Sequence, residues 1–164
     1  SNCTVKLKSN RNVKNDGIHM KKLLEKTNEK KENLQKKLQK KGIEIDVVKE
    51  VKKVIDNLKI KKSYEELEIY QLKINCPTFK NIDLMSELKT TTNAHIDTEK
   101  AILLNKNKVL LLCSGDPGKG HGEILLIAAY EYLQQNYTEV VLDALPTSFT
   151  FFERQGFSGK KWET

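Results

Sequence analysis

Residues 109–123 read VLLLCSGDPGKGHGE, and the rest of the chain is best understood outward from them. The apolar run at the start predicts a buried strand, the alternate glycines a tight turn, and the pattern from Ile124 onward a helix. Glycines let backbone N–H groups approach an oxyanion closely, and the helix dipole adds partial positive charge at the helix start. This succession of strand, turn and helix therefore predicts a phosphate or pyrophosphate site.

Two common phosphate loops fit this segment less well. A Walker A loop requires Ser or Thr after its lysine, but Gly120 follows Lys119, and no glycine stands five residues before Gly118. A dinucleotide fingerprint requires GxGxxG in a parallel unit, whereas the spacing here is GxGxG and the preceding strands are predicted to form a hairpin. Asp143 stands near the distance expected for the acidic residue of that fingerprint, so dinucleotide binding is kept as an alternative.

A third type of phosphate loop matches this segment better, and a second motif further along the chain supports the match. Pro117–Gly122 is similar to the Arg/Gln-x-x-Gly-x-Gly/Ala phosphate loop of the GCN5-related N-acetyltransferase superfamily. Ser148–Phe157 is similar to the A-x-x-F-Y-E-K-x-G-F helix and turn of the same superfamily. Between the two motifs, residues 124–135 resemble the central helix and Glu139–Ala144 the strand that follows it. The resemblance covers residues 109–157 and reaches the rest of the chain only through the order of the elements.

The resemblance implies an α/β (α+β) fold of the acyl-CoA N-acyltransferase type, a mixed sheet flanked by helices. It implies an enzyme that transfers an acetyl group from acetyl-CoA to an amine. The cosubstrate would lie between the splayed strands Val109–Cys113 and Glu139–Ala144, with its pantetheine arm along the first strand and its pyrophosphate on the loop amides. The residues expected to bind acetyl-CoA are Leu112, Cys113, Gly118, Lys119, Gly120, His121, Gly122, Glu123 and Phe152.

The chain departs from the superfamily pattern in ways that bear on catalysis. Pro117 stands where the loop usually begins with Arg or Gln, and Phe152 stands where many members have a tyrosine general acid. A non-catalytic acetyltransferase-like binding module is therefore the alternative function. The candidates for a general base are Asp143, Glu68 and Ser114, each of a type more often found in a surface or capping role. His121 is expected to present its backbone to the ligand and its side chain to solvent.

Composition bounds the remaining possibilities. With 164 residues the chain fits a single domain, in which residues 1–62 supply a first strand and two helices and residues 63–164 the sheet, the loop helix and a final helix. No apolar run approaches the roughly 20 residues that span a bilayer, and no signal-peptide pattern opens the chain. The three cysteines lack metal-ligand spacing, which favours reduced thiols, a cytoplasmic location and no metal.

The formal net charge is +7, and the basic residues are almost all lysine. Abundant Lys and Asn are typical of a genome rich in A and T. Proteins that recognise phosphate groups specifically usually use the forked guanidinium of Arg. Nucleic-acid binding is therefore kept only as a third alternative. It would act through Lys30, Lys31, Lys36, Lys37, Lys40 and Lys41.

Local patterns predict the other elements. The predicted elements before residue 63 are a strand at Cys3–Lys8, a helix at Ile18–Lys41, and a second helix capped by Asp46 with Val47, Val48, Val51, Val54, Ile55 and Leu58 on one face. Those after it are a capping box at Ser63–Glu66, a strand at Glu68–Cys76, a short helix at Asp83–Leu88, a loop at Thr90–Asn93, and a hairpin about Lys106-Asn107. In the hairpin, Asn107 is the residue expected to take a positive φ, which Asn tolerates. Nothing after Phe157 is long enough to supply two strands. We therefore expect an open sheet edge beside Glu139–Ala144. The expected consequence is either self-association through this edge, with Trp162 as an anchor, or a degenerate, shortened fold whose substrate side is open to solvent.

Overall fold

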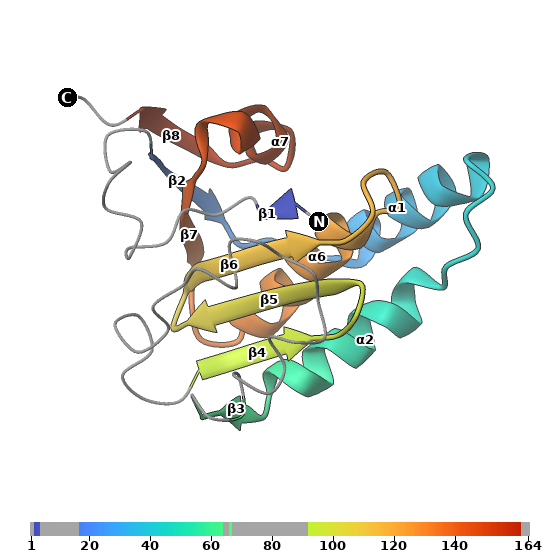
Figure 1. Ribbon diagram of the computed structural model, residues 1–164, viewed down its shortest axis with the longest axis horizontal. Helices are drawn as coiled ribbons and strands as arrows, with labels where there is room; N and C mark the ends of the chain where they lie inside the picture. Colours follow the sequence, from blue (N-terminus) through green and yellow to red (C-terminus); the bar gives the residue numbers. More distant parts are fainter. Residues whose placement is uncertain (1, 4–16, 64–65, 67–91, 162–164) are drawn as a thin grey trace.

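The computed structural model describes residues 2–3, 17–63, 66 and 92–161 (Figure 1). Several predictions fall outside these residues and are not tested by them. They are the strand Glu68–Cys76 with the candidate base Glu68, the helix Asp83–Leu88, the residues after Cys3 in the first predicted strand, and Trp162.

The described strands form one mixed sheet of eight strands, in the order β3-β4-β5-β6-β7-β2-β8, with β1 paired to β6 off this path. Only the β6–β7 pair is parallel. The strands are β1 Asn2–Cys3, β2 Ile18–Leu23, β3 Lys61–Lys62, β4 Thr92–Ile96, β5 Lys100–Asn105, β6 Lys108–Ser114, β7 Glu139–Ala144 and β8 Ser158–Lys161. The predicted class, a mixed sheet flanked by helices, is confirmed.

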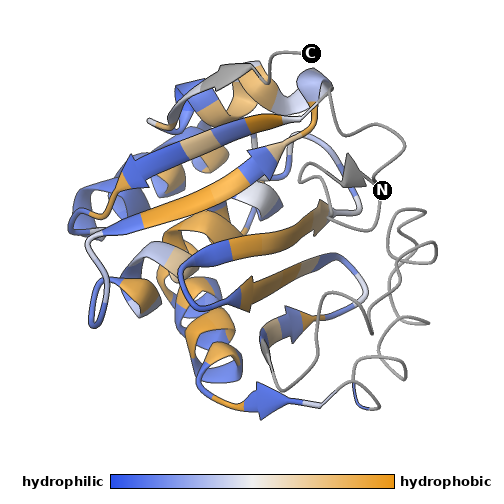
Figure 2. Ribbon diagram, turned by 90° about the vertical axis from the view of Figure 1, so that its left-hand side faces the viewer, coloured by the Kyte–Doolittle hydropathy of each residue, from blue (hydrophilic) through white to orange (hydrophobic). Residues whose placement is uncertain are grey.

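Four α-helices and a 3₁₀ turn complete the described part. They are α1 Asn28–Lys40, α2 Val47–Leu58, α6 His121–Leu133, η2 Pro146–Ser148 and α7 Phe149–Arg154. Ile124 to Tyr130 are buried without interruption, so α6 is enclosed on all sides, against β5 and β6 and beneath α1 and α2. Apolar residues accordingly gather along the central strands and on α6 (Figure 2). No helix in the described ranges has the length and apolar character of a membrane span.

The prediction of one helix from Ile18 to Lys41 is wrong in its first part. Residues 18–23 form β2, and the helix begins only at Asn28. Burial alternates along β2, with Ile18 and Met20 inside and His19 exposed. Six consecutive residues of β2 pair with β7, and four of them pair with β8 on the other side. Hydrogen bonding of β2 to a strand on each side stabilises the strand more than the helical spacing of its apolar residues favours a helix.

The predicted open edge beside β7 is also wrong, for the same reason. β2, which we expected to be helical, covers that edge, and β8 then pairs with β2. The two strands beyond β7, which we did not predict, therefore come from segments far apart in the chain, residues 18–23 and 158–161. The edge of the sheet at this side is β8, a strand of four residues.

The predictions for α2 and for the capping box are confirmed. Asp46 caps α2 by accepting the backbone N–H of Lys49 at 3.2 Å, and the predicted face of α2 is buried except for Val48, which is 60 % exposed. Ser63 and Glu66 form both bonds of a capping box, Ser63 N to Glu66 Oε2 at 3.1 Å and Glu66 N to Ser63 Oγ at 3.4 Å.

Two predictions about the hairpin region need correction. The β5–β6 hairpin forms as expected, but its left-handed residue is Lys106, with φ of 52°, rather than Asn107. Thr92 and Asn93, predicted as loop, are the first residues of β4, because they pair with β5 and with the short strand β3.

Candidate functional site

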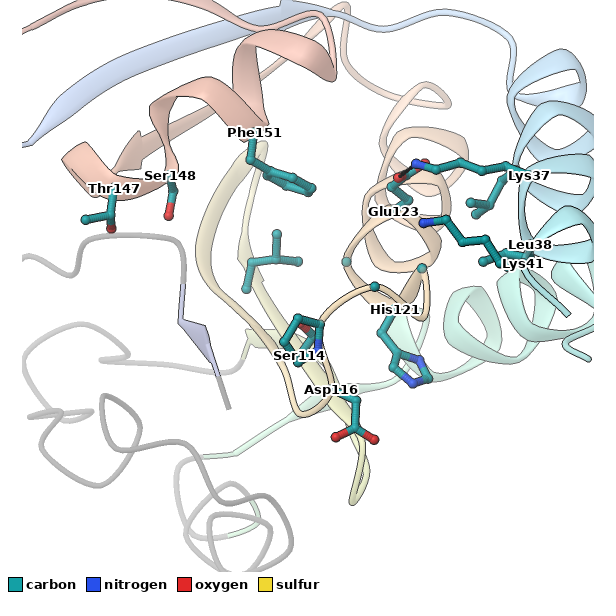
Figure 3. A pocket seen from close by; sticks show the side chains of 16 residues that line it. Lys37, Leu38, Lys41, Ser114, Asp116, His121, Glu123, Thr147, Ser148 and Phe151 are labelled. Atoms are coloured by element: carbon teal, nitrogen blue, oxygen red, sulfur yellow. Dashed lines mark hydrogen bonds and ion pairs between the residues drawn. The ribbon is translucent and has the colours of Figure 1, made fainter. Parts of the chain in front are cut away.

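A cavity of about 470 Å³ lies at the N-terminus of α6, where the glycine-rich loop leaves β6 (Figure 3). Its floor is made by the loop and by Leu112 and Ser114 of β6. Lys37 of α1 and Lys41, the C-cap of that helix, border one side. On the opposite side stand Thr147, Ser148 and Phe151, from η2 and α7. Three segments that are distant in sequence therefore enclose the predicted phosphate loop.

The loop holds its glycines in the conformation that an anion site requires. Gly118 and Gly120 have φ of +83° and +79°, a left-handed region that favours glycine. Gly120 is the N-cap of α6, and no side chain accepts a hydrogen bond there. The first amides of α6 are consequently left for another acceptor, next to the positive end of the helix dipole.

Helix α1 and its C-cap supply the cations of the cavity, an arrangement that no sequence pattern predicted. Leu34 and Leu38 of α1 are buried against the loop, so close that a Cβ on Gly120 would lie 3.1 Å from Leu38 Cδ2. This packing brings Lys37 Nζ to 2.8 Å from Glu123 Oε1 in the first turn of α6. Lys41, one turn further along α1, also borders the cavity (Figure 3).

His121 is buried, so the prediction that its side chain faces solvent is wrong. It is 4 % exposed, lines the cavity, and neither ring nitrogen has a hydrogen-bond partner. Glu99 Oε2, in the β4–β5 turn, lies 3.3 Å from Nε2. Burial lowers the pKa of His121, and the nearby charge of Lys100 lowers it further, against the opposing effect of Glu99. The imidazole is therefore held in its neutral form at pH 7.

Three of the residues expected to bind acetyl-CoA do not line the cavity with their side chains. Cys113 is fully buried on the face of β6 opposite to Leu112, because side chains alternate along a strand. Phe152 is fully buried, with its ring centroid 5.5 Å from that of Phe157. Phe151, the preceding residue, lines the cavity instead. Lys119 points outward and pairs with Asp116 at 3.2 Å.

Of the three candidate bases, Ser114 borders the cavity. Asp143 lies on β7 away from it, where its carboxylate oxygens are 2.9 Å from His19 Nδ1 and 3.0 Å from Lys108 Nζ. Both contacts engage the carboxylate on β7, away from the cavity, which argues against Asp143 as the base. Glu68 is outside the described residues.

Strands β6 and β7 stay together only briefly. They pair at two positions, Lys108 with Val141 and Val109 with Leu142, after which β6 runs on to Ser114 without β7. The expected divergence of these strands is therefore present. The far end of β6 is not bare, however, because Asn2 and Cys3 of β1 pair with Ser114 and Cys113. Since β5 occupies the other edge of β6 at the same residues, β1 lies along the edge that β7 has left.

Comparisons of the chain with protein-family models, with curated proteins and with solved structures give no match. Within the described ranges, no group of three or more His, Cys, Asp or Glu side chains is arranged to hold a metal ion. The site must therefore be interpreted from its own geometry.

Proposed function

We propose that this chain is an acyl-CoA N-acyltransferase-like domain that binds acetyl-CoA at the cavity before α6 and transfers the acetyl group to an amine. The observation that carries the proposal is the uncapped N-terminus of α6, which opens together with a left-handed glycine loop into a cavity bordered by lysines. Backbone amides, a helix dipole and Lys41 are all suited to a pyrophosphate. The two sequence motifs add the acyl-CoA chemistry.

In this proposal the parting of β6 and β7 gives the thioester its place beyond the pyrophosphate site. The amine attacks the thioester carbonyl carbon, the new C–N bond forms, and the C–S bond breaks with CoA leaving as its thiolate. The protein mainly holds the two reactants in position and polarises the carbonyl. We assign His121, at the cavity wall, to accept the proton that the amine loses, because its imidazole is neutral at pH 7 and neither ring nitrogen has a hydrogen-bond partner. Burial disfavours the charged form and so weakens His121 as a base.

Strand β1 occupies the edge of β6 that this proposal assigns to the pantetheine arm. The resemblance assigns the backbone near Leu112 and Cys113 to the pantetheine arm, but Cys3 pairs with Cys113. Binding of the arm along β6 then requires β1 to leave that edge. The N-terminal strand would act as an internal competitor of the cosubstrate.

A non-catalytic module that binds CoA remains the second candidate. Two observations favour it. Phe152 has no proton to give and lies fully in the core, and Asp143 is held between His19 and Lys108.

Calorimetry with acetyl-CoA, followed by a thiol-release assay over a panel of small amines, peptide N-termini and protein lysines, tests the proposal. Saturable binding with thiol release that depends on the amine supports the acyltransferase. Binding without release supports the non-catalytic module, and absence of binding to the folded protein contradicts both.

A further inference from the structure

A second cavity, of about 440 Å³, lies next to the first and is also lined by α6. The two cavities share four lining residues, namely Leu34, Lys37, Glu123 and Phe151. The second cavity continues along α6 to Tyr130 and is closed by α1 on one side and by the end of α7 on the other. A ligand seated at the start of α6 can therefore extend into it.

Positive charge predominates around the second cavity. Lys30 and Lys37 enter from α1 and Arg154 from α7, whereas Glu123 is the one carboxylate among its lining residues. Glu123 is already paired with Lys37. Neither Lys30 nor Arg154 has an ion-pair partner within the described part of the chain. An unbalanced guanidinium and ammonium on facing walls are suited to an anion, and the guanidinium fork matches phosphate.

The wall of the second cavity also contains a buried hydroxyl with no partner. Tyr130 is 1 % exposed, and its Oη has no hydrogen-bond partner. Burial raises the pKa of Tyr130, as does the charge of Glu123, so the group stays a neutral O–H donor. A buried hydroxyl normally forms a hydrogen bond, and leaving it without one is costly. A ligand oxygen in the cavity would satisfy it.

We propose that the second cavity binds a phosphate monoester, held by Arg154, Lys30 and the Tyr130 hydroxyl, on the same ligand whose pyrophosphate lies at the start of α6. The 3′-phosphate of CoA is such a group, and the assignment rests on the proposed function. Tyr130 is seven residues beyond Glu123, about 10 Å along the helix axis, and helical side chains lean back toward the N-terminus. The distance between the hydroxyl and the pyrophosphate site is thus no greater than the length of one nucleotide.

Dephospho-CoA, which lacks only the 3′-phosphate, provides the test. Calorimetry on the full chain should show CoA binding about 10-fold more tightly than dephospho-CoA, as expected for one charge-assisted phosphate contact. Arg154→Gln should reduce this ratio to nearly one while leaving the affinity for dephospho-CoA unchanged. Tyr130→Phe should reduce the ratio in part and should not destabilise the protein, because the hydroxyl it removes has no partner.

Lys36→Gln is the matched control, since Lys36 is an exposed lysine of α1 that lines neither cavity. It should keep the ratio of the parent. Equal affinity of the parent for CoA and dephospho-CoA, or a ratio that Arg154→Gln leaves intact, would overturn this inference while leaving the pyrophosphate site standing. Failure of the folded parent to bind either compound would overturn the proposed function as well.

Discussion

At Gly122 a substitution can test ligand binding without lowering the stability of the fold. It lies in the first turn of α6 with an ordinary helical backbone, and a Cβ there would meet only Phe151 Cζ, at 3.5 Å. Alanine is favoured over glycine in helices by up to about 1 kcal/mol, so Gly122→Ala should leave the free energy of unfolding equal or higher. The added methyl enters the cavity and should weaken acetyl-CoA binding about 10-fold, because it obstructs close approach to the amides.

Urea denaturation and calorimetry on the same preparation check both halves of this prediction. Acetyl-CoA binding by Gly122→Ala at the affinity of the parent would contradict the loop assignment. Gly120→Val would test the loop less cleanly than Gly122→Ala. Its φ of +79° and the contact with Leu38 at 3.1 Å mean that both fold and binding should suffer.

Asp97 organises a buried polar cluster next to the site. Burial raises its pKa, but a hydrogen bond with His95, the backbone amides of Glu99 and Lys100, and the charge of Lys100 together outweigh burial and bring the pKa well below its usual range. Asp97→Asn should therefore cost about 2 kcal/mol of unfolding free energy at pH 7, since Lys100 is 2 % exposed and loses a carboxylate at 3.7 Å.

The pH dependence of that loss follows from the sign of the shift. A carboxyl whose pKa is lower in the folded state stabilises the fold fully above its unfolded pKa of about 3.9, and loses this contribution as the pH falls further. The difference in stability between parent and Asp97→Asn should accordingly shrink between about pH 5 and pH 2. Urea titrations at several pH values measure it, and a difference that stays constant down to pH 2 would show that the ionised carboxylate is not the stabilising group.

At the scale of elements, β2 can be tested by a pair of substitutions. Met20 is fully buried on β2, whereas Leu23 is 69 % exposed. In a helix the two residues, three positions apart, would share one face. Met20→Ala should cost about 2–4 kcal/mol through loss of packing, while Leu23→Ala should change stability by less than about 0.5 kcal/mol. Denaturation with urea compares them. Similar costs for the two substitutions would favour a helix over the strand.

Strand β1 carries a prediction about access to the site. If it competes with the pantetheine arm for the edge of β6, deleting residues 1–16 should strengthen acetyl-CoA binding by up to about 10-fold, the worth of one or two backbone hydrogen bonds. Cys3→Pro, which removes a backbone donor from β1, should act in the same direction with a smaller effect. Calorimetry measures both variants, and weaker binding by the deletion variant would instead make β1 part of the site.

For the whole molecule, the corrected sheet changes the expectation about assembly. With β7 covered, the edge near the C-terminal end of the described chain is β8, which is four residues long and includes Lys160 and Lys161. Short edge strands resist pairing with a second chain. We therefore expect a monomer across concentrations in sedimentation velocity. A dimer that forms as the concentration rises would restore the edge as an association surface.

Several parts of the molecule follow from the sequence alone, because short-range chemistry determines them. The β6 strand, its glycine loop and α6 were predicted from an apolar run, alternate glycines and a helical pattern, all within residues 109–135. The Asp46 cap and the Ser63–Glu66 capping box depend on partners three residues apart. Such features are dictated by local hydrogen bonding and side-chain period, whatever surrounds them.

Only the tertiary structure decided what surrounds the loop. Thr27 bonds to Glu131, 104 positions away, and this contact helps hold α1 where Lys37 and Lys41 reach the cavity. The conversion of residues 18–23 into a strand depends on β7, more than 100 positions along the chain. Phe151 lines the cavity and Phe152 the core because α7 packs with one side inward, which sequence spacing alone does not fix. Contacts between distant segments leave no local pattern, so the sequence determined the loop and the fold determined its site.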